Sequence, residues 1–108
     1  MTRKIILDCD PGHDDAVALL LALGNPTIDL LGITTVGGNQ TLDKVSPTAL
    51  VVKEIAGHPE VPVYAGCDRP LVRPVEVAEA IHGSTGMDVE GVQLPEPSTA
   101  LADRKSVV

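Results

Sequence analysis

Three short apolar runs separate the polar stretches of the first 65 residues. They cover residues 4–8 ("KIILD"), 28–36 ("IDLLGITTV") and 61–65 ("VPVYA"). Each run is short, and turn-forming residues such as glycine, proline and asparagine border the runs. This pattern predicts three buried β-strands.

Two longer segments between these runs have helical character. Residues 14–23 ("DDAVALLLAL") are strong helix formers with two acids in the predicted first turn, and "GNP" follows them at 24–26. Residues 41–56 predict a second helix that closes at Gly57. Pro47 lies inside this segment and predicts a break or a late helix start.

The predicted order is β-α-β-α-β with short connections, which indicates an α/β fold with a Rossmann-like open, mostly parallel sheet. The loops after the three strands should therefore meet at one edge of the sheet, where such folds bind ligands. Beyond residue 68 the sequence is rich in proline, glycine and acids, with a short helical hint at 76–81. We expect a long surface loop or lid there.

The amino-acid composition limits the kinds of partner that the chain is expected to bind. The net charge of −7 argues against binding to nucleic acid or to an anionic membrane, and Tyr64 as the single aromatic residue offers little for base stacking. No apolar run is long enough for a membrane span, and the first residues do not resemble a signal peptide. Cys9 and Cys67 are too few for a disulfide scaffold, so we expect a reduced, cytoplasmic setting.

Four aspartates fall within eight positions, at Asp8, Asp10, Asp14 and Asp15. Three ionised carboxylates about 6 Å apart would repel by roughly 8 kcal/mol in total at an effective dielectric of about 20. A helix N-terminus returns only about 0.3–1 kcal/mol per acid. Either one carboxyl stays protonated or a cation binds, and clustered carboxylates suit Ca²⁺ or Mg²⁺.

Simpler roles are open for individual members of this cluster. Asp14 or Asp15 could be the N-cap of the first helix. Asp8, at a strand end, is expected to form a local hydrogen bond rather than to ligate a metal.

The stretch "DCDPGHDDAVALLLAL" resembles the N-terminal signature of the inosine/uridine-preferring nucleoside hydrolases, or nucleoside N-ribohydrolases. "ITTVGGNQTLDK", "VPVYAGCDRPLVRP", "IHGSTGMD" and "LPEP" are similar to later segments of that family, in the same order. The resemblance covers residues 4 to about 97. It implies hydrolysis of the N-glycosidic bond of ribonucleosides to ribose and free base.

The resemblance also implies roles for single residues. Asp10 would ligate Ca²⁺ and act as general base toward a calcium-bound water, and Asp15 would be a further calcium ligand. Asp8 would support these ligands without contacting the metal itself. A base is needed because calcium acidifies water less than zinc does.

On the substrate side, the resemblance implies that Asp14 and Asn39 bind the ribose and that His82 lies near the nucleobase as a proton donor. Carboxylates beside the sugar would stabilise the positive charge that develops there during bond cleavage. From the residues alone, Asn39 could equally be a turn residue or the N-cap of the second helix. His82 alone would be an ordinary loop histidine.

The chain departs from the family chiefly in length, since family members are about three times as long. We therefore expect residues 1–108 to be the N-terminal part of a single nucleoside hydrolase domain, weak or inactive alone, whose full-length parent forms homotetramers or dimers. Residues 103–108 ("DRKSVV") match the translation of a common sequencing adapter, so we expect a non-native tail.

Two other functions compete with this reading. The spacing of Asp8 and Asp10 also resembles the Asp-x-Asp motif of Mg²⁺-dependent phosphatases of the haloacid dehalogenase type, although Gly12 replaces the expected Thr or Val. A non-catalytic calcium- or ribose-binding chain is the second alternative.

Overall fold

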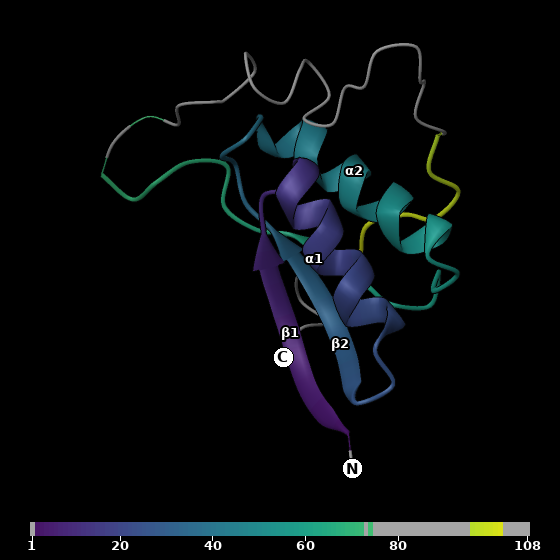
Figure 1. Cartoon of the computed structure of the whole chain (residues 1–108). Helices are drawn as coiled ribbons and strands as arrows, with labels where there is room; N and C mark the ends of the chain where they lie inside the picture. The colour runs from purple at the N-terminus through teal and green to yellow at the C-terminus, as the bar shows by residue number, and fades with distance from the viewer. Residues whose placement is uncertain (1, 73, 75–95, 103–108) are drawn as a thin grey trace.

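The computed structural model describes residues 2–72, 74 and 96–102 (Figure 1). It contains the five predicted elements in the predicted order: β1 (Arg3–Cys9), α1 (His13–Gly24), β2 (Ile28–Thr35), α2 (Leu42–Ile55) and β3 (Val63–Ala65). The helical hint at 76–81 and the tail at 103–108 lie outside the described residues.

The three strands form one parallel sheet in the order β1-β2-β3. Asp8 pairs with Thr34 of β2, which in turn pairs with Tyr64 of β3, so these three positions form a row across the sheet. The parallel sheet with helical crossovers confirms the predicted α/β fold. The carboxyl ends of β1 and β2 lie together at one edge (Figure 1).

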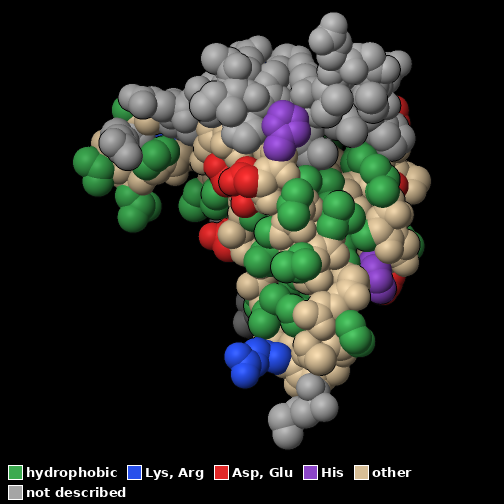
Figure 2. Space-filling view, viewed as in Figure 1, with side chains coloured by type: hydrophobic (Ala, Val, Ile, Leu, Met, Phe, Trp, Pro, Cys, Tyr) green, Lys and Arg blue, Asp and Glu red, His purple; other side chains and the backbone are tan. Residues whose placement is uncertain are grey.

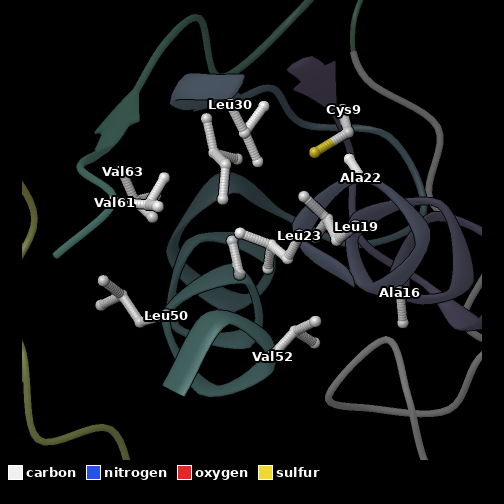
Figure 3. Close-up of a cluster of buried hydrophobic side chains, with 12 residues drawn as sticks. Cys9, Ala16, Leu19, Ala22, Leu23, Leu30, Leu50, Val52, Val61 and Val63 are labelled. Atoms are coloured by element: carbon white, nitrogen blue, oxygen red, sulfur yellow. The ribbon is translucent and has the colours of Figure 1, made fainter. Parts of the chain in front are cut away.

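One hydrophobic core lies between the sheet and the two helices, which lie side by side on the same side of the strands (Figure 3). Leu19 of α1, Ala49 of α2, and Ile33 and Val63 of the sheet are all 0% exposed. Burial of a large aliphatic side chain contributes about 1.5–3 kcal/mol. This core fixes how the elements sit against one another, and hence where the strand ends meet.

The predicted break or late start at Pro47 is wrong, because α2 begins at Leu42 and continues through Pro47 to Ile55. A proline removes the hydrogen bond to the carbonyl four residues earlier, here that of Asp43, an exposed residue. The buried side chains of Val45 and Ala49 flank the proline and anchor both turns to the core. Their burial offsets the lost bond.

The second described segment, 96–102, returns to the end of α2 and the edge of β3. The Glu54 carboxylate accepts hydrogen bonds from both the backbone N–H and the hydroxyl of Ser98 and of Thr99. The N–H of Ala102 donates to the carbonyl of Val63 at 2.8 Å. Residues 98–102 are therefore tied to the end of α2 and to β3.

Charged side chains of opposite sign lie at the two ends of β1. In Figure 2, acidic side chains lie at the end of the visible face away from the N-terminus, and Lys and Arg side chains lie near the opposite end. This matches the position of Arg3 at the start of β1 and of the aspartate cluster beyond its end. Among the described residues, no helix is long and apolar enough to cross a membrane.

Candidate active site

The aspartate cluster sits where β1 turns into α1. The helix begins at His13, and its N-cap is Gly12, which has no side-chain capping bond. Asp14 and Asp15 lie in the first turn, so the alternative that one of them is the N-cap is wrong. Asp14 is exposed, whereas Asp15 is partly buried. The first turn thus presents one carboxylate to solvent and turns the other toward the strand end.

Asp10 is held by neighbours on both sides. Its backbone N–H donates to Oδ2 of Asp15 at 3.0 Å. Its own Oδ2 accepts the backbone N–H of Asn39 at 3.0 Å, and its carbonyl accepts the side-chain Nδ2–H of Asn39 at 2.7 Å. Residues 29 positions apart in the sequence therefore meet at the sheet edge, as the parallel fold predicts.

The loop after β2 is fixed to the ends of both neighbouring strands. Val36 N–H donates to the carbonyl of Cys9 at 3.0 Å, and Gly37 N–H donates to the carbonyl of Cys67 at 3.1 Å. The three strand ends are joined by backbone bonds, which confirms that their loops share one edge. The N-cap of α2 is Thr41, so the alternative that Asn39 caps this helix is wrong.

The close carboxylates change the acidity of the site. The pKa of Asp15 is raised from 3.8 to about 6, chiefly by its partial burial and then by the side chain of Asp10, which is both a hydrogen-bond partner and a neighbouring charge. Asp15 therefore binds a proton more strongly than an isolated aspartate does, because protonation removes the buried charge and with it the repulsion from Asp10. A bound cation would relieve the same repulsion.

The donor atoms suit calcium in kind, because Asp10 and Asp15 offer hard carboxylate oxygens. Calcium takes about 6–8 oxygen ligands. Within the described ranges there is no group of three or more His, Cys, Asp or Glu residues placed to hold a metal. These two residues could thus supply part of a calcium site, with the other oxygens coming from water, from backbone or amide carbonyls, or from outside the described residues.

Asp8 forms a hydrogen bond at the end of its strand, as expected from the residues alone, and its partner lies on the neighbouring strand. Its Oδ1 accepts the Thr34 hydroxyl at 2.6 Å, across the β1–β2 pair and at an exposed position. Its support of the calcium ligands stays a prediction. His82, the predicted proton donor, lies outside the described residues.

Gly38 lies in the loop after β2, directly against Asp10. A Cβ built on Gly38 would collide with Oδ2 of Asp10 and lie 3.0 Å from its Cγ. A glycine directly before an asparagine in a strand-end loop was the available signal, but only the fold shows which residue approaches it.

A hollow of about 650 Å³ lies beside this edge, between the start of α2 and the end of β3. Asp43, Asp68 and Leu101 are among its lining residues. The cluster residues Asp10 and Asp15 do not line it. The hollow is therefore next to the aspartate site rather than part of it.

Comparison with known proteins gives a consistent result. Residues 5–108 match the model of the inosine-uridine preferring nucleoside hydrolase family. The inosine-uridine preferring nucleoside hydrolase of Leishmania major is 58% identical over 107 residues, which cover 99% of this chain and 34% of that protein. The corresponding protein of Crithidia fasciculata is 64% identical over 87 residues, covering 81% of this chain and 28% of that protein.

A solved structure agrees with these relatives. The purine-preferring ribonucleoside hydrolase from Gardnerella vaginalis superposes with a TM-score of 0.84 at 36% identity, covering 94% of this chain and 33% of that one. The chain spans about a third of the length of the relatives it matches. From the match of its sequence and its fold, the chain belongs to the inosine-uridine preferring nucleoside hydrolase family.

Proposed function

We propose that this chain makes up the N-terminal part of a nucleoside hydrolase domain, which cleaves the N-glycosidic bond of ribonucleosides to give ribose and a free base. The observation that carries the proposal is the pair of carboxylates, Asp10 and Asp15, held at the meeting point of three parallel strand ends. Family membership supplies the reaction class, since the matched relatives are named as nucleoside hydrolases.

In the proposed mechanism, Asp10 is the general base. Its carboxylate would take a proton from the attacking water. A base must lie within hydrogen-bond reach of the proton it removes, and the hydrogen bonds from Asn39 and to Asp15 hold Asp10 in one position. The half-buried Asp15 and the exposed Asp14 add negative charge to the same edge. This charge would stabilise the positively charged sugar of the transition state.

The proposed cofactor is Ca²⁺, held by Asp10 and Asp15, which would neutralise the paired carboxylates and orient the water. Asp14, exposed in the first turn of α1, would bind the ribose 2′-hydroxyl. His82 would protonate the leaving base, as histidine can near neutral pH. The roles of His82 and Asp14 are proposed from the family resemblance.

The proposed substrate class is a free ribonucleoside, with no preference assigned for the base. Relatives are named as inosine-uridine preferring, pyrimidine-specific and purine-preferring, so the shared N-terminal part is compatible with different bases. We also propose that the enzyme is a homo-oligomer and that it is cytoplasmic. The two free cysteines of the chain are in keeping with a reducing compartment.

The match to nucleoside hydrolases disfavours the phosphatase alternative.

Purified residues 1–108 should show weak or no turnover of inosine or uridine with calcium, because Asp10 and Asp15 supply only part of a calcium shell. Full turnover by this chain would contradict that expectation. Calorimetric heat on adding Ca²⁺ without product would support a binding role for the chain alone.

The activity can be tested in a chimera in which residues 2–102 replace the matching part of the Leishmania major relative. We expect base release from inosine or uridine, measured by absorbance. Asp10→Asn should lower kcat by about 10²–10⁴, the usual contribution of a general base. Asp29→Asn, an exposed carboxylate at the other end of the sheet, is the matched control and should leave kcat unchanged. A chimera with Asp10→Asn as active as the control would refute the assignment.

A further inference from the structure

Three atoms of Asp10 are held at the sheet edge. The N–H is bonded to Asp15, while the carbonyl and Oδ2 are both bonded to Asn39. The bond to Oδ2 comes from a backbone N–H, so it does not depend on the side chain at position 39. A hydrogen bond to a carboxylate is stronger than one between two neutral groups. Together these bonds restrict both the backbone and the carboxylate of Asp10.

Gly38 makes this arrangement possible. A Cβ at position 38 would collide with Oδ2 of Asp10 and stand 3.0 and 3.1 Å from its Cγ and Cβ. The Gly38 backbone is itself anchored, since its N–H donates to the carbonyl of Gln40 at 2.9 Å. Because the loop is tied down on both sides, a side chain at position 38 would have to displace the carboxylate.

We infer that Gly38 and Asn39 are positioning residues for Asp10, a role that rests on the proposed function of Asp10 as general base and calcium ligand. Gly38 leaves the space that the carboxylate occupies. Asn39 fixes the carboxylate with its backbone and fixes the Asp10 carbonyl with its side chain. Asn39 therefore acts on the reaction through Asp10, whereas the family resemblance had suggested contact with the ribose.

The first test uses the complete 108-residue chain without ligand. The variants are Gly38→Ala and Asn39→Ala, and the matched control is Gly24→Ala, because a Cβ at Gly24 has no neighbour within 4 Å. NMR would record the ¹³C signal of the Asp10 carboxyl and the deuterium exchange of the amide at position 39. In Gly38→Ala we expect the carboxyl signal to move and the exchange to speed up by about tenfold, the equivalent of one hydrogen bond.

The inference is overturned if Gly38→Ala leaves both signals as they are in Gly24→Ala. Should Gly38→Ala fail to fold, Asn39→Ala decides the question, because it removes only a side-chain bond. The ¹³C signal of the Asp10 backbone carbonyl, which accepts the Asn39 side-chain N–H, should then move while the fold is retained. An unchanged carbonyl signal in a folded Asn39→Ala chain would also overturn the inference.

The second test separates positioning from ribose binding by calorimetric titration with Ca²⁺ alone. With no sugar present, Gly38→Ala and Asn39→Ala should each weaken calcium affinity by about tenfold relative to Gly24→Ala. An Asn39 that only binds ribose would leave calcium affinity unchanged, and that result would refute its positioning role. If the unsubstituted chain gives no heat, these residues alone do not bind calcium, and the NMR test decides the positioning.

Discussion

Cys9 shows how strongly the strand end shapes the chemistry of a single residue. It is the last residue of β1, only 7% exposed, and part of the hydrophobic core. The pKa of its thiol is raised from 9.0 to about 12, chiefly by burial and to a smaller extent by the neighbouring charges of Asp15, Asp8 and Asp10. The thiolate is the reactive form of cysteine, so Cys9 should be inert in the folded chain.

Alkylation tests this prediction. With iodoacetamide at about pH 8, Cys67, which is exposed, should be modified quickly and Cys9 should remain unmodified. Peptide mass spectrometry distinguishes the two sites. In denaturant both cysteines should react, which is the control for reagent access. Equal rates at both sites in the folded chain would contradict the assigned environment of Cys9.

Between elements, a buried pair of hydroxyls joins β2 to α2. Thr35 Oγ1 and Ser46 Oγ lie 2.7 Å apart, and the two residues are 0% and 1% exposed. A buried polar group that loses its partner costs about 1–3 kcal/mol, whereas removal of both partners costs less. The pair therefore helps to set the position of α2 against the sheet.

A double-mutant cycle can measure this link. Thr35→Val should lower the free energy of unfolding by about 1–3 kcal/mol, because it leaves the Ser46 hydroxyl without this bond. Adding Ser46→Ala should cost little more, so the double variant should be less destabilised than the sum of the single variants. Urea denaturation supplies the free energies. Simple additivity would show that the two hydroxyls do not interact.

Glu54 links α2 to the segment 96–102 in a way that depends on pH. Hydrogen bonds from Ser98 and Thr99, led by the Ser98 backbone N–H, lower the pKa of Glu54 from 4.5 to about 2. A carboxylate with a lowered folded-state pKa stabilises the fold above its unfolded pKa. The contribution should therefore be complete above about pH 5 and should be lost as the pH falls from 4.5 toward 2.

NMR titration between pH 6 and pH 2 checks this link. The Ser98 and Thr99 amide signals should change with a midpoint clearly below 4.5, and Glu54→Gln should abolish that transition. Glu60, whose lowered pKa does not arise from bonds to 96–102, provides the control, since Glu60→Gln should leave the transition in place. A midpoint at or above 4.5 would contradict the observed carboxylate contacts.

At the scale of the whole molecule, large apolar side chains remain at the surface. On α1, Val17, Leu20 and Leu21 are 63%, 44% and 70% exposed. On the sheet, Ile6 and Leu31 are 60% and 48% exposed. Exposed apolar patches of this kind favour association, and the edges of an open sheet add unpaired backbone groups. We therefore expect the purified chain to self-associate.

Sedimentation velocity tests that expectation. Leu21→Lys should shift the chain toward monomer while changing the free energy of unfolding by no more than about 0.5 kcal/mol, because the side chain is mostly exposed. Ala18→Lys is the matched control, since it adds the same charge at an exposed position on α1 but removes little apolar surface. Equal sedimentation of the two variants would mean that charge, rather than apolar contact, controls association.

Much of the fold was accessible from the sequence because its signals are local. Apolar runs, helix-forming composition and the stop after Gly24 located every described strand and helix to within two residues at each end. Pro47 was the exception, since the burial of its neighbours outweighed its local preference. The site was partly predictable, because crowded aspartates are visible in sequence, while the bonds that Asn39 and Gly38 make to Asp10 are not.

By itself, the sequence determined the α/β class, the shared edge for the strand-end loops and the carboxylate chemistry at that edge, because composition and spacing along the chain carry these features. Only the tertiary structure decided that Asp10 is fixed by Asp15 and Asn39, that Gly38 gives it room, and that Asp8 bonds to Thr34 instead. Such contacts join residues up to 29 positions apart. They exist only after the buried core has set the strands in register.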